Sequence, residues 1–476
     1  MNKSFCRRFA VTLPKTNGHL VESVSSLARL NRQATDWSRT GKFKMQVFRI
    51  EGGRSLQGEV DVPGSKNASL AILSAVPLAS EPVTLTRVPD ISDIRIKLEM
   101  LREWGAEIEW DGDSVTIDCS TLSYTKPAAP IVRPIRTSFY LLGPLVARLG
   151  KATLPMPGGC LIGARPVDFH IKGLKILGAE ISQSEGAYIA ETDGLKGGEI
   201  YLDFPSAGAT QHLMSAGTLA DGITTIRNAA VEPEVTTLAD FLNRMGARIE
   251  GAGTSTLTIH GVSKLGGCTY PIPADRMQAA TYLMAAAITK GDVKVNHILP
   301  EHQNATMNKL LEAGAKVDEG PDWVRVRCDQ RLKGIRVRTM PYPGFPTDIQ
   351  QPMAAVLTLA KGTSVVEETI YESRIGHVAE LNRMGANVKV EGRSTLIEGV
   401  GSLDGSVVQA TDLRAGAALC LAGLAAEGET IVENIHFIDR GYANMAEIVR
   451  SLGGVMERLE RDTTDSESGS RIQSRS

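Results

Sequence analysis

The sequence has few aromatic residues and no excess of either charge. Phe, Trp and Tyr make up 5% of the 476 residues, and 52 Lys and Arg residues face 54 Asp and Glu residues. Proteins that bind nucleic acids or membrane surfaces usually carry a basic excess, and single-stranded nucleic acids need aromatic side chains for stacking. We therefore expect no nucleic-acid or membrane partner. A local basic pocket for a phosphorylated small molecule is still compatible with this composition.

Signatures of metal and cofactor sites are also missing. The six cysteines are scattered without a CxxC pair, and the eight histidines show no ligand spacing. Both features argue against a structural zinc site. No Walker loop, GxGxxG or HExxH motif occurs either.

Long apolar runs are absent as well. No uninterrupted run reaches the roughly 18 residues that a transmembrane helix needs. Scattered cysteines in a chain of this size are typical of reduced thiols in a cytosol-like compartment, so we expect a cytoplasmic protein. The sequence carries no signal for an oligomeric state.

The two ends differ from the rest of the chain. Residues 1–44 contain nine Lys and Arg residues against two acids, and residues 461–476 form a polar, low-complexity tail. The first segment fits an organelle transit peptide, a disordered extension, or translated sequence upstream of a start at Met45. We favour the last two interpretations over targeting, and we expect the tail to be disordered.

One short pattern recurs six times: an amphipathic stretch, a Gly-Ala or Gly-Gly pair, and a strand-like run. Successive first glycines are separated by 73, 68, 68, 71 and 68 residues; they are Gly105, Gly178, Gly246, Gly314, Gly385 and Gly453. A second glycine marker runs in phase, between an Ala/Leu-rich stretch and a β-branched strand, at Gly150, Gly222, Gly291, Gly362 and Gly428. Both sets suit helix C-termini that need a left-handed residue. Each unit of about 70 residues therefore reads strand, helix, strand, helix, strand, strand, and six units can close into two three-unit domains.

Each unit also has a polar loop just before its first helix. These loops are Gly64–Asn67, Arg133–Arg136, Ser206–Gly208, Asp275–Arg276, Thr347–Asp348 and Thr411–Arg414. Simple N-capping explains any single one of them. Lys or Arg at several starts is less expected, because a cation there is unfavourable unless an anion binds. Helix N-termini that converge on one cleft would form a receptor for a polyanion.

Two stretches carry residues suited to catalysis. Three glycines surround Cys160 in the run Gly158–Pro166, and Arg165 close by favours the thiolate. Asp348, in Phe345–Asp348, can cap its helix or accept a proton from a hydroxyl. From the residues alone, an inert loop cysteine and a helix cap are the simpler interpretations.

An ordered set of motifs resembles a known family. PGSKNASLAIL, GPLVAR, PGGCLIGARPVD, PSAGAT, FPTD, ATDLRA and HFIDRGY occur in the order found in UDP-N-acetylglucosamine 1-carboxyvinyltransferases, over roughly residues 46–460. The resemblance implies an α/β fold, a two-domain inside-out barrel of six βαβαββ repeats, three per domain. It implies domains of residues 45–65 with 274–460, and of residues 66–273, which carry the Cys160 loop.

The resemblance implies an activity and its substrates, a chemistry that requires no redox cofactor, and no obligatory metal. Members transfer enolpyruvyl from phosphoenolpyruvate to the 3-hydroxyl of UDP-N-acetylglucosamine, the first committed step of peptidoglycan precursor synthesis. Cys160 matches the cysteine that protonates the methylene carbon and that fosfomycin alkylates. Asp348 matches the presumed general base. The cations that hold phosphoenolpyruvate match Lys66, Arg165 and Arg440.

Further positions match family residues around the substrates. The matches are Arg136, Arg374 and Arg414 as cleft cations, Asn67 as a ligand of the sugar, Asp412 as a second acid near the reacting carbons, and Ser206, Gly208 and Ile370 around the UDP moiety. Phe204 stands where some members carry a Lys toward the UDP phosphates. That departure puts the diphosphate contacts in doubt and leaves the reaction untouched.

Two alternatives remain from the sequence. One is an enolpyruvyl transferase for another acceptor, such as a nucleotide of secondary metabolism; the related shikimate enzyme lacks the PGGCxIGARP loop. The other is a nonenzymatic sensor of nucleotide sugars on the same fold. Such a sensor would need fewer of the residues Cys160, Lys66, Arg165, Asp348 and Arg440.

Overall fold

The structure is a computed structural model that describes Asp36–Trp37 and residues 43–123, 132, 134–156, 158, 163 and 167–462. Residues Phe48–Arg458 form one compact unit, and the described residues before and after them belong to a second unit. Strand β1 (Asp36–Trp37) pairs antiparallel with the first residues of β2 (Phe43–Glu51). Across the described residues, no helix is both long and apolar enough to cross a bilayer.

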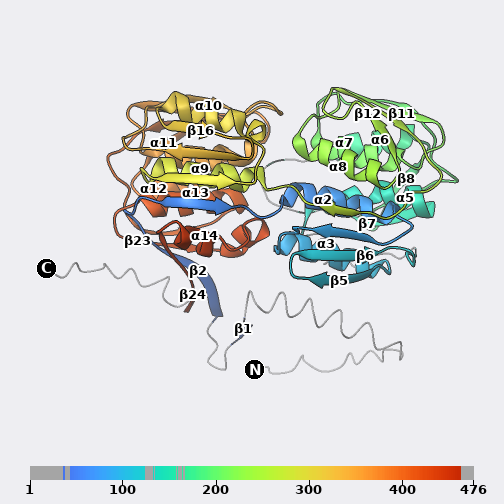
Figure 1. Cartoon of the computed structure of the whole chain (residues 1–476), viewed down its shortest axis with the longest axis horizontal. Coiled ribbons are helices and arrows are strands. Elements are labelled where there is room, and N and C mark those ends of the chain that lie inside the picture. Colours follow the sequence, from blue (N-terminus) through green and yellow to red (C-terminus); the bar gives the residue numbers. More distant parts are fainter. Residues whose placement is uncertain are drawn as a thin grey trace, which may run out of the picture. The chain divides into compact units, whose positions relative to one another are not determined.

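One six-element unit recurs within Phe48–Arg458 (Figure 1). Residues 199–260 show it as β10 (Glu199–Tyr201), α7 (Ala207–Gly217), β11 (Ile223–Arg227), α8 (Pro233–Arg244), β12 (Arg248–Glu250) and β13 (Thr256–His260). Its strands form a sheet in the order β10-β11-β13-β12, in which β10 and β11 are parallel and the other pairs antiparallel. Alternate residues of β13 are buried, as expected for a sheet with one face on a core.

The same order recurs along the chain. The first unit comprises β3 (Gln57–Asp61), α2 (Lys66–Ala75), β4 (Val83–Thr86), α3 (Ser92–Glu103), β5 (Glu107–Asp111) and β6 (Ser114–Asp118). In the second, the described elements are η2 (Arg136–Leu141), α5 (Leu142–Leu149), β7 (Lys151–Pro155), α6 (Asp168–Ile176), β8 (Glu180–Ser184) and β9 (Ala187–Glu191). The fourth comprises β14 (Thr269–Pro271), α9 (Arg276–Ile288), β15 (Asp292–Asn296), α10 (Asn304–Ala313), β16 (Lys316–Glu319) and β17 (Trp323–Arg327).

The last two units follow the same plan. The fifth comprises β18 (Arg336–Arg338), η4 (Thr347–Ile349), α11 (Gln350–Thr358), β19 (Thr363–Glu367), α12 (His377–Arg383), β20 (Asn387–Glu391) and β21 (Ser394–Glu398). The sixth comprises β22 (Val407–Gln409), α13 (Leu413–Ala425), β23 (Glu429–Glu433), η5 (Ile435–Arg440), α14 (Met445–Ser451) and β24 (Val455–Asp462). Strand β2 completes the sixth sheet by pairing with β23 through Phe48–Glu51.

Two strands are exchanged between the first and fourth units. β3 is the parallel neighbour of β15, and β14 is the parallel neighbour of β4. As a result, three sheets take their strands from residues 83–271, and three take theirs from residues before 62 and after 291. The chain passes between the two sets twice, through the segments that precede α2 and α9.

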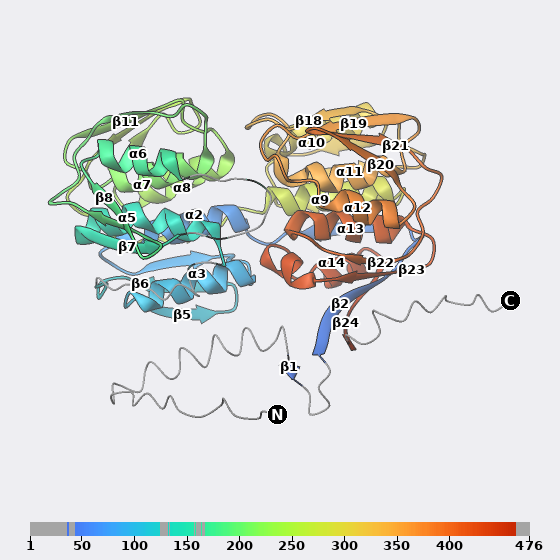
Figure 2. The same cartoon turned by 180° about the vertical axis from the view of Figure 1, so that it is seen from behind.

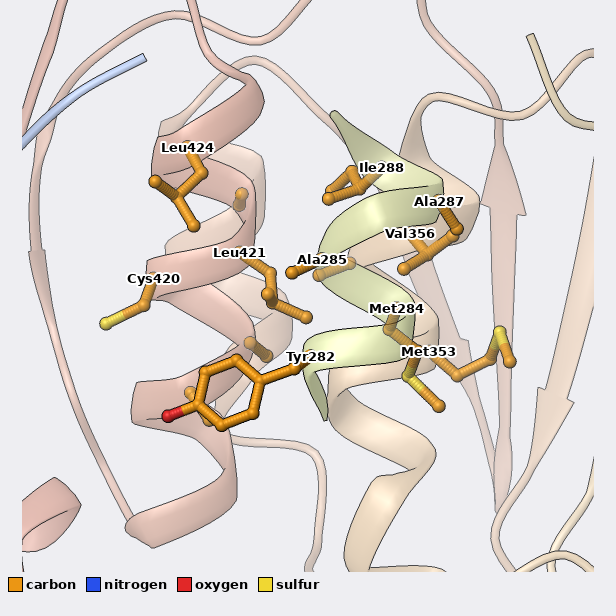
Figure 3. Close-up of a cluster of buried hydrophobic side chains, with 14 of the residues drawn as sticks. Tyr282, Met284, Ala285, Ala287, Ile288, Met353, Val356, Cys420, Leu421 and Leu424 are labelled. Carbon is orange, nitrogen blue, oxygen red and sulfur yellow. The ribbon is translucent and has the colours of Figure 1, made fainter. Parts of the chain in front are cut away.

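Helices that are buried on every side form the core of the second set (Figure 2). All thirteen residues of α9 are buried, as are all nine of α11 and nearly all of α13. A helix with no polar face must be enclosed. Figure 3 shows how Tyr282, Met284, Met353 and Leu421 fill the space between these three helices.

The glycine periods have the predicted structural cause in all but one case. The six glycines of the first pattern, and four of the five in the second, have positive φ angles at helix ends or turns. Gly291 is the exception, because the left-handed residue there is Lys290, with φ of 52°. Gly291 is needed for a different reason: a Cβ at this position would overlap the backbone of Leu56.

The buried helices generate a stability prediction. Leu421 is 1% exposed on α13, whereas Leu311 is 49% exposed on α10. Leu421→Ala should lower the free energy of unfolding by about 3 kcal/mol, because it removes apolar contacts and leaves a cavity. Leu311→Ala is the matched control and should change it by less than about 0.5 kcal/mol. Urea denaturation followed by circular dichroism measures both, and equal effects would contradict the enclosed position of α13.

Candidate active site

A cavity of about 460 Å³ brings the predicted helix starts together. Five of the six contribute to its wall, through Asn67, Arg136, Ser206 with Gly208, Arg276, and Thr347 with Asp348. Free N–H groups and helix dipoles make such starts favourable for anions. Ile370 and Phe204 also line the cavity, and Phe204 is 43% exposed.

Asp275 links the starts of α2 and α9. Its Oδ1 accepts hydrogen bonds from the backbone N–H groups of Met277 and Gln278, at 2.8 and 2.9 Å. Its Oδ2 accepts one from the backbone N–H of Lys66, at 3.0 Å. One buried carboxylate therefore caps one helix and fixes the first residue of another from a distant part of the sequence.

The side chains of Lys66 and Arg440 meet on a carboxylate that sequence reasoning missed. Asp93 Oδ2 lies 2.9 Å from Lys66 Nζ, and Asp93 Oδ1 lies 2.9 Å from Arg440 Nε. All three residues are largely buried. Burial alone would raise the pKa of Asp93, but the two cations hold it below its ordinary value. Asp93 is thus an ionised counterion to two residues predicted to bind phosphoenolpyruvate.

Asp348 lies between two arginines and caps no helix. Its Oδ1 accepts a hydrogen bond from Arg374 Nη1 at 2.8 Å, and its Oδ2 accepts one from Arg414 Nη2 at 3.1 Å. No side chain caps η4 or α11, so the simple capping interpretation is wrong. Burial would raise the pKa of Asp348, yet the arginines hold it well below its ordinary value. The side chain keeps 26% of its surface exposed, at the cavity wall.

Behind Asp348 lies a buried polar layer. Arg414 Nη1 donates a hydrogen bond to the Tyr442 hydroxyl at 3.1 Å, and that hydroxyl lies 2.8 Å from Thr281 Oγ1. Asp412 caps α13 through the N–H groups of Arg414 and Ala415 and accepts a hydrogen bond from Gln351 at 3.0 Å. The sixth predicted helix start, Thr411–Arg414, does not line the cavity. It contacts Asp348, which does line it, through the Arg414 side chain.

A second ion pair in the wall was also missed. Arg276 Nε and Nη2 donate to the two carboxylate oxygens of Glu234 at 2.8 and 3.0 Å, and both side chains are buried. Glu232 lines the cavity beside them, and burial raises its pKa. Such a fork-to-fork pair fixes the position of Arg276.

Cys160 and Arg165 lie outside the described residues. The four cysteines that the structure describes as free thiols are Cys119, Cys268, Cys328 and Cys420. Burial raises the pKa of each, to about 12 for Cys119. A raised pKa disfavours the reactive thiolate, so none of the four has the environment of a nucleophile. Within the described ranges, no group of three His, Cys, Asp or Glu side chains is arranged to hold a metal ion.

Comparison with known proteins places the chain among enolpyruvyl transferases. Residues 50–467 match the family model described as EPSP synthase (3-phosphoshikimate 1-carboxyvinyltransferase). UDP-N-acetylglucosamine 1-carboxyvinyltransferase from Finegoldia magna is 48% identical over 420 residues, covering 87% of this chain and 99% of the relative. UDP-N-acetylglucosamine 1-carboxyvinyltransferase 1 from Caldanaerobacter subterraneus is 46% identical over 411 residues, covering 86% and 99%.

Solved structures of other enolpyruvyl transferases share the fold of this chain. The enolpyruvyl transferase NikO from Streptomyces tendae has a TM-score of 0.80 and 26% identity, covering 88% of this chain and 99% of NikO. An EPSP synthase from Acinetobacter baumannii, at 23% identity, shares the fold with a TM-score of 0.66, covering 87% of this chain and 100% of its own. These likenesses confirm the predicted fold class, the inside-out α/β barrel of six βαβαββ units. Since sequence and fold agree over nearly all of the relatives' length, the chain belongs to the EPSP synthase family and, within it, to the UDP-N-acetylglucosamine 1-carboxyvinyltransferases.

Proposed function

We propose that the protein transfers the enolpyruvyl group of phosphoenolpyruvate to the 3-hydroxyl of UDP-N-acetylglucosamine and releases phosphate. The relatives' names state this acceptor and this group. One observation in the structure carries the proposal: the cavity and its margin hold two carboxylates, each ionised between two cations, among helix N-termini. A reaction that joins a trianionic donor to a nucleotide diphosphate needs such a density of positive charge.

Phosphoenolpyruvate would bind at Lys66 and Arg440, with Arg165 as a third cation. A guanidinium matches a carboxylate or phosphate with paired hydrogen bonds, and an ammonium adds a point charge. Asp93 satisfies Lys66 and Arg440 in the structure, through contacts of 2.9 Å. The substrate anion would share or replace these contacts, so Asp93 keeps the two cations oriented before phosphoenolpyruvate arrives.

The acceptor sugar would bind beside Asn67 and Asp348, with Ser206, Gly208 and Ile370 toward the UDP. Asn67 and Asp348 line one cavity, which also contains the aromatic side chains of Tyr140, Phe169 and Phe204. Asp348 would accept the proton of the 3-hydroxyl. Because Arg374 and Arg414 favour its ionised form, it would accept that proton only once the hydroxyl oxygen bonds to a cationic carbon.

The chemistry would proceed by addition and elimination. The Cys160 thiol gives a proton to the methylene carbon of phosphoenolpyruvate, and the neighbouring carbon becomes cationic. The 3-oxygen bonds to that carbon and loses its proton to Asp348, which forms a tetrahedral ketal. Phosphate then leaves with the bridging oxygen, the Cys160 thiolate takes a proton back from the methyl carbon, and the enol ether remains. Closure of a cavity around these steps excludes water.

The proposed role is that of a cytoplasmic enzyme in cell-wall synthesis. Its product would feed peptidoglycan assembly, and through it cell shape and division. The intact GGC motif at Gly158–Cys160 supports the proposal that fosfomycin inhibits the protein.

The first prediction concerns turnover. Phosphate should be released from phosphoenolpyruvate only when UDP-N-acetylglucosamine is present, and fosfomycin should abolish the release by alkylating Cys160. A Cys160→Ser variant should lose turnover and keep its affinity for the nucleotide sugar. A colorimetric phosphate assay and titration calorimetry measure the two properties. Release with a different hydroxyl acceptor alone would support another transferase, and binding without any release would support a sensor.

The second prediction separates binding from chemistry at Asp348. Asp348→Asn should lower kcat by 100-fold or more, since a positioned general base contributes roughly 10²–10⁴-fold. The KM for the nucleotide sugar should change far less. Asp113→Asn, at an exposed position between β5 and β6, is the matched control and should leave both constants unchanged. A larger effect on KM than on kcat would contradict the base assignment.

The third prediction concerns Asp93 as a counterion. Asp93→Asn leaves two largely buried cations without their anion, so the free protein should melt at a lower temperature. Phosphoenolpyruvate replaces the missing charge, so it should raise the melting temperature more in the variant than in the unaltered protein. Asp90→Asn, which removes the partner of exposed Arg95, serves as the control. Equal stabilisation of variant and unaltered protein in thermal-shift titrations would contradict a shared site.

A further inference from the structure

Two buried histidines from different helices form a pair at the cavity wall. Nδ1 of His170, on α6, lies 3.0 Å from Nδ1 of His212, on α7. Tyr140 stacks on His170 with ring centroids 5.4 Å apart, and Phe139 meets it edge-on at 5.5 Å. Tyr140 and Phe139 therefore restrict the orientation of the His170 ring.

A backbone donor determines the tautomer of His212. The N–H of Gly143, at the start of α5, donates a hydrogen bond of 2.7 Å to Nε2 of His212. A Cβ on Gly143 would lie 2.7 Å from that same nitrogen, so only glycine permits this approach. Because Nε2 accepts, the proton of a neutral His212 must be on Nδ1.

The tautomer of His170 follows from that of His212. If Nδ1 of His212 carries its proton, it donates to Nδ1 of His170, which must then be the acceptor. The proton of a neutral His170 is consequently on Nε2. The hydrogen bond from Gly143 to His212 therefore determines that Nε2 is the donor atom of His170.

The surroundings keep both rings neutral. Burial, with a smaller contribution from Arg136, lowers the pKa of His170 to about 3. Burial, His170 and Lys97 lower the pKa of His212 well below its ordinary value. Lys97 is itself buried on α3, where its Nζ donates to the Thr137 carbonyl at 2.6 Å. Burial also lowers the pKa of Lys97 well below its ordinary value. Burial is therefore the main cause that opposes protonation of either ring.

His170 also lines the cavity of about 460 Å³. Its Nδ1 faces His212, and across the described residues its Nε2 has no hydrogen-bond partner. Tyr140, Phe169, Phe204 and Gly208 line the cavity as well. This group includes the residues expected around the UDP moiety, whereas Asp348 and Asn67 are those expected at the sugar.

We propose that His212 is a positioning residue that holds His170 as a neutral Nε2–H donor, for an acceptor oxygen on the nucleotide part of UDP-N-acetylglucosamine. The inference rests on the proposed function for the identity of the ligand, and on geometry alone for the tautomers. A ring held in this state offers a donor and no acceptor to the cavity. It favours ligands that present an oxygen at this point and rejects those that present an N–H group there.

The tautomers can be read directly. Long-range ¹H–¹⁵N spectra of protein labelled with ¹⁵N-histidine distinguish Nδ1–H from Nε2–H rings, and His170→Asn and His212→Asn samples assign the signals. We expect an Nδ1–H ring for His212 and an Nε2–H ring for His170, without ligand and at neutral pH. An Nδ1–H ring for His170, or a protonated ring at either position, would overturn the proposal.

Two substitutions of His212 separate donor loss from simple repacking. Asn places an amide N–H near the position of Nδ1 and keeps the donor to His170, whereas Gln places its amide near Nε2 and loses that donor. His212→Gln should raise the KM for UDP-N-acetylglucosamine by about 3- to 10-fold, the effect of one hydrogen bond. His212→Asn should restore most of the affinity, and kcat at saturation should change little in either variant. Equal KM values for the two variants would contradict the positioning role.

Two further measurements complete the test. His170→Asn removes the Nε2–H donor itself and should raise KM at least as much as His212→Gln. His297→Asn is the matched control, since His297 is exposed, pairs with Asp61 and has a φ of 55° that Asn tolerates. If the unaltered protein binds no UDP-N-acetylglucosamine, the proposed function fails, and the spectra still decide the tautomers. If it binds this ligand and His170→Asn binds it equally well, the inference fails while the proposed function stands.

Discussion

The need to enclose apolar helices is the constraint on which the rest of this structure depends. α9 and α11 are buried along their whole length and α13 along nearly all of it, so other elements must surround them. In each unit the first helix then lies in the buried core, and the strands form a sheet that covers it. Since repeated units present repeated ends, the starts of several inner helices reach one cavity. The convergence of helix N-termini, whose free N–H groups favour anions, thus follows from the packing of the core.

Buried carboxylates make this concentration of cations tolerable. An unpaired charge removed from water costs several kcal/mol, so each cation near the cavity needs a counterion. Asp93 serves Lys66 and Arg440, Asp348 serves Arg374 and Arg414, and Glu234 serves Arg276. Two of these carboxylates also suit the chemistry: one holds cations in place for an anionic substrate, and the other faces the acceptor. The same ion pairs therefore stabilise the site without substrate and orient its cations for an anionic substrate.

The sequence predicted the repeated unit because its signals are local. Glycine is needed where φ is positive, and this need repeats with the fold, as at Gly246 and Gly385. Gly291 is an exception, because glycine is required there by the close approach of the Leu56 backbone. No local sequence pattern reveals that contact. Cap residues such as Ser65 and Asp412 were predictable for the same local reason. The domain boundaries and the roles of Cys160 and Arg165 remain predictions.

Pairings between distant residues could not be read in this way. Asp93 resembles any acid in the first turn of a helix, and its partner Arg440 lies 347 residues away. Asp348 looked like a cap because its two arginines, at positions 374 and 414, are brought to it only by the fold. His212 lies within a largely apolar helix, and its proposed role depends on its hydrogen bonds with Gly143 and His170. In each case the missing information was a tertiary contact.

The fate of one oxygen atom tests the account most directly. Phosphoenolpyruvate labelled with ¹⁸O at its bridging oxygen would be converted with UDP-N-acetylglucosamine, and both products analysed by mass spectrometry. The addition–elimination account predicts that the label leaves with phosphate, because the carbon–oxygen bond breaks. Label retained in the three-carbon product would show cleavage of the phosphorus–oxygen bond, and would contradict enolpyruvyl transfer at this site.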